Sequence, residues 1–242
     1  MEHSTVLSIR NLSRTITVGG ETKQTVDDVS FNFTSDKIYS IIGPSGAGKS
    51  SLLRLLNRLD EPTSGEIIFN DKKYDEYTPC QLRCKIGYLF QTPYLFDKTV
   101  KDNLLYANDK LSEEEMLALL DKVQIDRAFL TKSVENLSVG EKQRIAFSRL
   151  LATKPQVILL DEPTSALDPS LTESIEQMIK EIVTAENLTA IVVTHNPEQA
   201  LRLSEETLLL HNGRLIESGA TDQIINHPQT EIGQRYRQRS LK

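Results

Sequence analysis

Short apolar stretches recur along the chain, separated by polar turns. Alternating apolar and polar residues predict short strands at 6–12 and 29–33, with Gly19 and Gly20 in a turn between them. Residues 37–42 predict a strand that runs into a glycine-rich loop, and 65–71 and 86–90 predict two more. In the helix expected at 50–59, the leucines fall on one buried face: Leu52, Leu55, Leu56 and Leu59.

The middle of the chain has a helical period. Residues 112–123 are amphipathic, and Glu113 to Glu115 occupy the first turn, where the helix dipole favours acidic side chains. The inward positions expected there are Met116, Leu117, Leu120 and Val123.

After residue 152 a rhythm of buried strand and helix resumes. We expect strands at 157–160 and 189–194, helices at 171–183 and from 196 to 203, and a hairpin turning at Asn212-Gly213. The whole chain, 1–242, is therefore predicted to be one α/β domain: 1–91 and 153–242 form the core, and 92–152 form a helical insert.

The glycine-rich loop at residues 43–50 reads GPSGAGKS and fits the phosphate-loop pattern G-x-x-x-x-G-K-[ST] between a strand and a helix. Glycines allow backbone N–H groups to surround an anion, and the helix N-terminus adds positive potential. Lys49 can reach the β- and γ-phosphates, and Ser50 can ligate Mg²⁺. The expected nucleotide contacts are Gly43, Pro44, Ser45, Gly46, Ala47, Gly48, Lys49, Ser50 and Ser51.

A second acidic motif follows the buried strand at 157–160. Asp161 ends this strand at the edge where α/β proteins bind ligands, and it suits the coordination shell of Mg²⁺. Glu162 suits a general base that activates water against the γ-phosphate.

A third motif, LSVGEKQR at 137–144, carries a Ser-x-x-Glu capping box. Ser138 should cap the helix, and Glu141 should reach back to the Ser138 N–H. Such a helix N-terminus can also receive an anion.

Taken together, these three motifs resemble those of the ATP-binding subunits of ABC transporters over nearly the whole chain. The resemblance implies a P-loop NTPase of ABC ATPase type: a mixed-sheet core, an antiparallel β subdomain and a helical insert subdomain. It implies Gln91 as the Q-loop glutamine near the nucleotide and the metal, residues 165–168 as the D-loop ending in Asp168, and His195 as a catalytic switch histidine.

The same resemblance implies a head-to-tail dimer that binds two ATP molecules with Mg²⁺. The partner would be a second copy or a paralogous cassette. Ser138 and Gly140 would then contact the γ-phosphate of ATP held by the partner's phosphate loop. A GTPase or small-molecule kinase would share the loop but would not need the other motifs.

The sequence departs from the family pattern in three places, and each departure leads to an expectation. Val139 stands where glycine is usual, so backbone strain is expected if the position needs a positive φ. Glu141 stands where glutamine is usual and adds negative charge, so a weaker cross-interface contact is expected. No aromatic residue lies between Ile9 and Phe31 to stack on adenine, which leaves Ile16 or Arg14 to cover the base.

Composition and charge limit the partners and the cellular location that we expect for this chain. The net charge of −6 gives no support to nucleic acid as a partner. No apolar run reaches the ~20 residues that span a bilayer, and the first ten residues lack the pattern of a signal peptide. Cys80 and Cys84 share a helix face without a third metal ligand nearby, so reduced thiols are expected. We therefore expect a cytoplasmic chain, and the resemblance to ABC transporter subunits implies that it is bound to the membrane face through a permease.

The transported substrate is chosen by the permease, so the sequence indicates it only through resemblance. Residues 89–104 and 129–151 look most like cassettes paired with iron-exporter-type metal permeases. Importers of phosphate or polar amino acids, and a soluble regulatory ABC ATPase, are the alternatives. Tyr94, Leu95 and Phe96 cannot all point inward, so at least one is expected at a groove that receives a permease helix.

Overall fold

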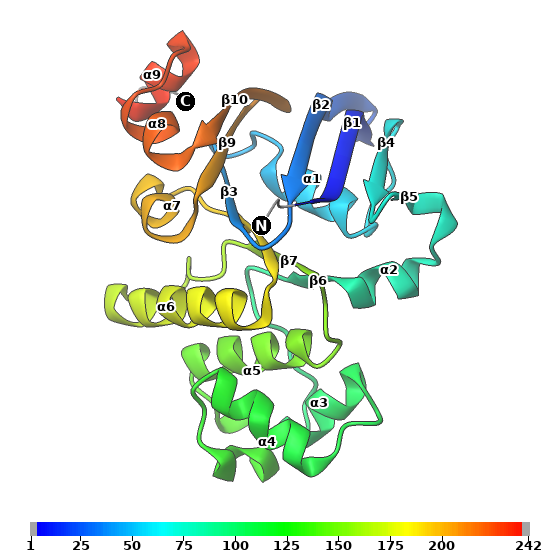
Figure 1. Cartoon of the computed structure of the whole chain (residues 1–242), viewed down its shortest axis with the longest axis vertical. Coiled ribbons are helices and arrows are strands. Elements are labelled where there is room, and N and C mark those ends of the chain that lie inside the picture. Colours follow the sequence, from blue (N-terminus) through cyan, green and yellow to red (C-terminus); the bar gives the residue numbers. More distant parts are fainter. Residues whose placement is uncertain (1–3, 239–242) are drawn as a thin grey trace.

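The computed structural model describes residues 4–238. Two sheets and a group of helices are stacked along the long axis of the molecule (Figure 1). The larger sheet has the order β10-β9-β3-β8-β7-β6. Its strands are β3 (Ile38–Ile42), β6 (Ile86–Leu89), β7 (Val157–Asp161), β8 (Thr189–Val193), β9 (Glu206–His211) and β10 (Arg214–Ala220).

All neighbours in this sheet are parallel except the hairpin of β9 and β10, which turns at Asn212-Gly213 as predicted. Strands β7 and β8 are covered on both faces, as their unbroken apolar sequences indicate. Ile158, Leu160, Ala190 and Val192 face the helical side, and their neighbours along each strand face the second sheet.

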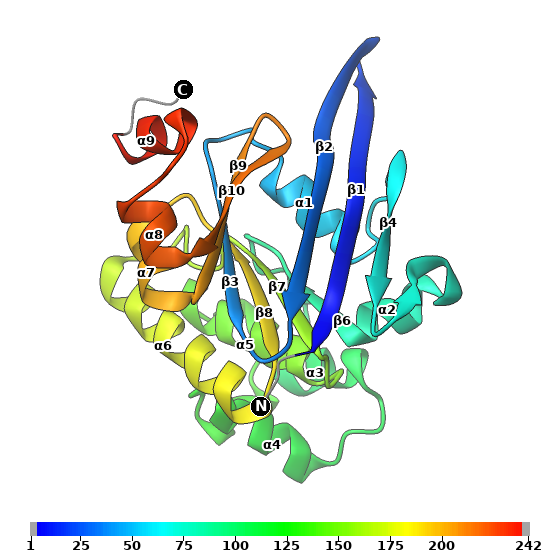
Figure 2. The same ribbon diagram turned by 45° about the horizontal axis from the view of Figure 1, so that its top comes forward.

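The second sheet is antiparallel, in the order β2-β1-β4-β5. It consists of β1 (Thr5–Val18), β2 (Glu21–Thr34), β4 (Ser64–Phe69) and β5 (Lys72–Lys73). Helix α1 (Lys49–Leu56) lies between the two sheets and buries its leucines against both (Figure 2).

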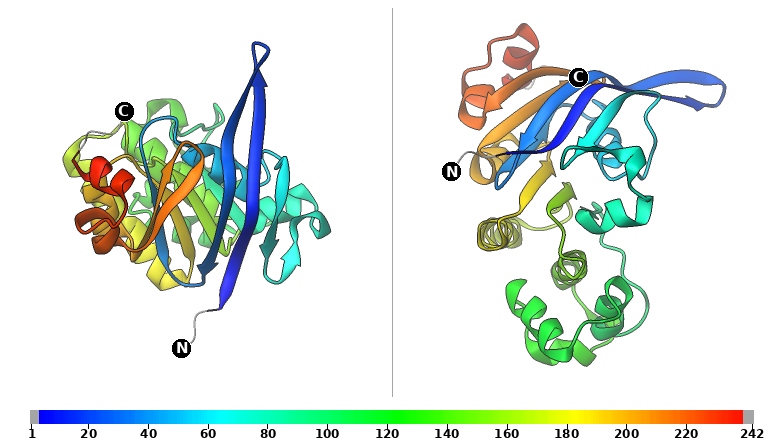
Figure 3. Two further views of the ribbon diagram at one scale, coloured as in Figure 1. Left: turned by 90° about the horizontal axis from the view of Figure 1, so that it is seen from above. Right: turned by 45° about the vertical axis from the view of Figure 1, so that its right-hand side comes forward.

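The prediction of short strands at 6–12 and 29–33 was wrong in extent. Strands β1 and β2 have 14 residues each, and their outer halves project from the body around the Gly19-Gly20 turn (Figure 3). On the β2 side of the turn, residues 21–25 include no apolar residue and no buried side chain, so this stretch lacks the alternation that marks a half-buried strand. The β1 side does alternate from Thr15 to Val18, but Ile16 is only half-buried.

The helix predicted at 50–59 is also shorter than expected. Arg58 adopts φ 54°, and the Leu59 N–H bonds to the Arg54 carbonyl at 2.9 Å, which ends α1 in the left-handed manner common at helix C-termini. Leu59 therefore lies outside the helix and is only half-buried.

The remaining helices cover the edges and the far side of the larger sheet. Helices α3, α4 and α5 gather at one end of the molecule, where α5 packs on β6 and α6 lies beside α5 (Figure 1). On α4, Met116 and Leu120 are buried as expected, while Leu117 is half-buried and Leu119 is buried instead. The helices are α2 (Pro79–Lys85), α3 (Val100–Ala107), α4 (Glu113–Lys122), α5 (Val139–Leu151), α6 (Pro169–Glu186), α7 (Pro197–Leu203), α8 (Thr221–Asn226) and α9 (Glu231–Arg237), with 3-10 turns at Tyr74–Glu76, Arg127–Thr131 and Val134–Asn136.

Two further expectations concern the surface. Cys80 and Cys84 are exposed free thiols on α2, and burial raises the pKa of Cys84, so its thiol stays protonated. Between residues 4 and 238, no helix has the length and apolarity needed to cross a membrane.

Candidate active site

The candidate site lies at the carboxyl edge of the larger sheet. Because β3, β6, β7 and β8 are parallel, the segments that follow them meet at one edge (Figure 2). Those segments carry the phosphate loop, Gln91, Asp161 with Glu162, and His195.

Glycines fix the path of the phosphate loop. Gly48 is the N-cap of α1 and has φ 100°, where a Cβ would lie 2.2 Å from the Thr25 carbonyl oxygen. At Gly43, a Cβ would lie 2.1 Å from the Leu210 carbonyl oxygen. Only glycine therefore lets this loop pass between β2 and β9 and present the N-terminus of α1.

Lys49 lies inside the loop and is only 7% exposed. Its ammonium group donates to the carbonyl oxygens of Gly43 and Pro44, each at 2.9 Å. Burial lowers the pKa of Lys49, while the carboxylates of Glu162 and Asp161 act in the opposite direction. The ammonium group is thus poorly hydrated and aimed at a place where anionic oxygens would stabilise it.

Ser50 and Asp161 meet across the site. The Ser50 hydroxyl donates to Asp161 Oδ1 at 2.9 Å, and the Tyr88 hydroxyl donates to Oδ2 at 2.8 Å. Burial, followed by the charge of Asp161, raises the pKa of Tyr88, so this phenol remains a donor. The role of Tyr88 was missed because its strand, 86–90, was interpreted only as apolar.

Glu162 is the centre of a second group. His195 Nδ1 lies 3.2 Å from Glu162 Oε2, and Gln91 Nε2 donates to the same oxygen at 3.3 Å and to Ser165 Oγ at 3.1 Å. Glu162 has φ 47°, an uncommon conformation for a non-glycine residue, and its N–H donates to the Val193 carbonyl. The backbone is thus turned so that Glu162 leaves the strand beside His195.

The two groups face one hollow of about 480 Å³. It is lined by the phosphate loop and α1 (Ser45 to Ser51), Gln91, Glu162, His195, and two hairpin residues that the sequence did not indicate, Lys23 and Thr25. Their place depends on how the long hairpin folds over the loop, for which local sequence gives no signal.

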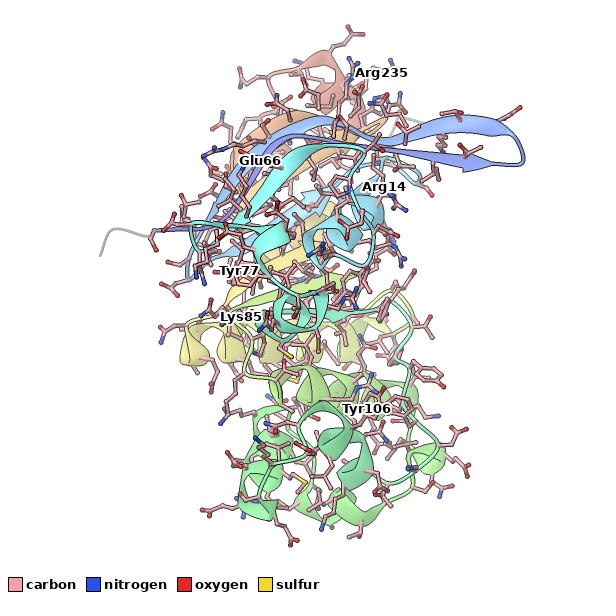
Figure 4. All side chains as sticks on the ribbon, turned by 90° about the vertical axis from the view of Figure 1, so that its right-hand side faces the viewer. Arg14, Glu66, Tyr77, Lys85, Tyr106 and Arg235 are labelled. Atoms are coloured by element: carbon pink, nitrogen blue, oxygen red, sulfur yellow. The ribbon has the colours of Figure 1, made fainter. Side chains whose placement is uncertain are left out.

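The two residues expected to cover the base differ in their surroundings. Arg14 is held by Asp60 at 2.7 Å near the base of the projecting hairpin (Figure 4), which argues against its covering the base. Ile16 pairs directly with Lys23 across the hairpin, so the two side chains share a face.

The capping box at Ser138 is confirmed. Ser138 is the N-cap of α5, its N–H donates to Glu141 Oε2 at 2.7 Å, and the Glu141 N–H donates to Ser138 Oγ at 3.3 Å. The expectation of strain at Val139 was wrong, because Val139 is the first helical residue of α5 and does not have a positive φ.

Gly140 and Asp168 have packing roles within the chain. A Cβ at Gly140 would lie 2.5 Å from the Leu171 side chain, so this glycine allows α5 to approach α6. Asp168 caps α6 by accepting the Leu171 N–H at 3.0 Å. Neither residue, nor Ser138, lines the hollow at the phosphate loop of its own chain.

An aromatic groove of about 330 Å³ lies between the core and the helical end. Its walls include Phe90, Tyr94, Phe96 and Tyr106, and the rings of Phe96 and Tyr106 are tilted at 49° with centroids 4.1 Å apart (Figure 4 labels Tyr106). Tyr94 is 69% exposed and Leu95 is buried, which confirms that the three apolar residues point in different directions.

Comparison with known proteins identifies the family. Residues 26–165 match the ABC transporter family, and the chain belongs to it. ABC transporter I family member 17 of Arabidopsis thaliana is 36% identical over 238 residues, covering 97% of this chain and 89% of that protein. Phosphate import ATP-binding protein PstB 3 of Natronomonas pharaonis is 39% identical over 229 residues, covering 86% and 81%.

Solved structures agree. The ATP-binding cassette MJ0796, determined as a dimer in a post-hydrolysis state with ADP and Pi, matches with TM-score 0.79 and 30% identity, covering 89% of this chain and 98% of that one. CbiO1 from Clostridium perfringens, part of the ABC transporter complex cbiONQ, matches with TM-score 0.82 and 27% identity, covering 92% and 91%. The chain is therefore an ATP-binding and ATP-hydrolysing cassette with the P-loop ABC fold, as its sequence predicted.

Proposed function

We propose that this cassette powers transport through a separate permease at the cytoplasmic face of the membrane. In this proposal, residues 1–91 and 153–242 form the catalytic core, and 92–152 form a helical subdomain that reaches the permease. The observation that carries it is the meeting of Lys49, Glu162, His195 and Gln91 around one hollow, beside a separate aromatic groove.

ATP would bind with its phosphates in the loop from Gly43 to Ser51. The backbone N–H groups at the start of α1 would receive the phosphate oxygens. Lys49 would exchange the carbonyl oxygens of Gly43 and Pro44 for the β- and γ-phosphates, which compensate its charge better than neutral carbonyls.

The residues at the far side of the hollow fit Mg²⁺. Ser50 and Asp161 offer hydroxyl and carboxylate oxygens that already meet at 2.9 Å, and the Gln91 side chain lies nearby on the Glu162 carboxylate. Oxygen ligands of this kind are those that Mg²⁺ prefers. A bound ion would neutralise charge on the phosphates.

Hydrolysis would use Glu162 and His195. Glu162 would accept a proton from a water molecule as the water oxygen bonds to the γ-phosphorus and the bond to the β,γ-bridging oxygen breaks. His195, 3.2 Å from Glu162, would orient that carboxylate and contact the γ-phosphate. Gln91 would link the same carboxylate to the segment that leads into the aromatic groove.

A second cassette would complete each site. Ser138, Gly140 and Asp168 lie outside the hollow of their own chain, so their contact with nucleotide would be made across a head-to-tail dimer. The dimeric form of the similar cassette MJ0796 supports this arrangement.

For cargo, we propose a metal ion exported through an iron-exporter-type permease. A second candidate is phosphate import, favoured by the 39% identity to a phosphate import ATP-binding protein. The test is to purify the tagged chain from native membranes and identify the bound membrane protein. Reconstituted vesicles should then transport either iron or phosphate, and recovery of no membrane protein would favour a soluble regulatory ATPase.

A further inference from the structure

The hydroxyl of Ser138 has one proton, and that proton is already used inside the chain. Ser138 Oγ donates to Glu141 Oε2 at 2.8 Å, while the Ser138 N–H donates to the same oxygen at 2.7 Å. Ser138 Oγ also accepts the Glu141 N–H at 3.3 Å. The hydroxyl therefore cannot donate to a phosphate until it turns away from Glu141.

Glu141 is also charged in this position. Hydrogen bonds from the Ser138 backbone N–H and hydroxyl hold the pKa of Glu141 below its usual range. Ser138 is exposed, so the carboxylate that it contacts lies at the surface where an approaching phosphate would meet it. A γ-phosphate would have to displace the Glu141 carboxylate from the Ser138 hydroxyl and would then remain beside that carboxylate.

A capping box does not require this charge. At the start of α2 the chain closes the same box with a neutral partner: the Thr78 N–H donates to Gln81 Oε1 at 3.1 Å, and the Gln81 N–H donates to Thr78 Oγ1 at 3.3 Å. The carboxylate of Glu141 thus adds something beyond what the helix needs.

We propose that Glu141 competes with ATP for Ser138 and thereby weakens ATP-driven association of two cassettes. The inference rests on the proposed head-to-tail dimer. Association would require Glu141 to release the Ser138 hydroxyl, so the cassettes would stay apart until ATP is abundant or a permease brings them together.

The test uses Glu162→Gln protein, in which slow hydrolysis keeps ATP bound, and measures by sedimentation velocity the ATP concentration that gives half dimer. Adding Glu141→Gln should lower that concentration about fivefold or more, since a neutral amide releases the hydroxyl more easily than a carboxylate. The matched control is Glu115→Gln, which neutralises the equivalent residue of the Ser112 box on α4 and should change nothing.

Glu141→Met is the second variant, should the first fail to fold, and the same direction is expected. If a folded Glu141 variant needs the same or a higher ATP concentration for half dimer than Glu162→Gln protein alone, the inference is overturned, although the proposed dimer stands. If no variant dimerises although each binds ATP, the proposed dimer itself is wrong, and the inference is overturned with it.

Discussion

At the scale of single residues, the polar groups of the site are paired within the chain. Lys49 donates to two loop carbonyls, Ser50 to Asp161, and Ser138 to Glu141. In the proposed mechanism, each of these contacts would be exchanged for a contact with a phosphate oxygen or a metal ion. Binding energy is therefore a difference between two sets of hydrogen bonds, which makes it sensitive to single substitutions.

The first prediction concerns Lys49. Lys49→Ala should weaken ATP binding about tenfold to a hundredfold, because a charge-assisted contact of about 1.5–3 kcal/mol is lost. Titration with a fluorescent ATP analogue measures this directly. Lys110→Ala, on an exposed turn distant in sequence from the phosphate loop, is the matched control and should bind normally. Near-normal binding by the Lys49 variant would show that ATP binds elsewhere.

The second prediction concerns base selectivity. Without an aromatic residue between Ile9 and Phe31, adenine loses stacking worth roughly 1–3 kcal/mol in nucleic-acid binders. GTP should therefore compete for the site within about tenfold of ATP. Ile16→Tyr, on the same hairpin face as Lys23, should restore a preference for ATP. A preference of about a thousandfold in the unchanged chain would contradict this prediction.

At the scale of elements, burial decided what the sequence could predict. Strands β7 and β8 are buried on both faces and α5 begins at a capping box, and each leaves a local pattern that is easy to recognise. On the projecting part of the β1–β2 hairpin, residues 21–25 are all polar and none is buried, so this stretch leaves no strand pattern. Lys23 and Tyr88 reach the site only through strand register and pairing, so nearby sequence could not indicate them.

The third prediction concerns the loop after Gln91. Tyr94→Asp should leave folding and ATP binding unchanged, because Tyr94 is exposed, but should reduce assembly with the permease. Leu95→Asp places a charge in the core and should destabilise the chain by about 3 kcal/mol or more. Thermal unfolding and co-purification with the permease separate the two effects. Normal assembly of the Tyr94 variant would exclude this groove as the docking surface.

At the scale of the whole molecule, the residues proposed to contact ATP lie in two places that do not meet within one chain. The phosphate loop lines a hollow at the carboxyl edge of the larger sheet, whereas Ser138 is the N-cap of α5, which packs against α6, and does not line that hollow. ATP in the hollow would be covered on one side only. A second cassette turned head to tail would bring its own Ser138 to the uncovered side, so ATP would become part of the interface.

The last prediction follows from this geometry. Glu162→Gln removes the carboxylate proposed to accept the proton from water but keeps an amide that can contact His195 and Gln91. ATP should therefore bind and persist, and the variant should sediment as a dimer with ATP and Mg²⁺ and as a monomer without them.

Two controls test the nucleotide dependence of this dimer. ADP should leave the variant monomeric, because only the γ-phosphate would reach the second chain. Chelation of Mg²⁺ should shift the dimer toward monomer, since the charge on the phosphates is then no longer neutralised. If the variant binds ATP but stays monomeric at saturating ATP, the proposed dimer of cassettes is wrong. If it dimerises equally with ADP, the contact does not depend on the γ-phosphate, and the proposed place of Ser138 is wrong.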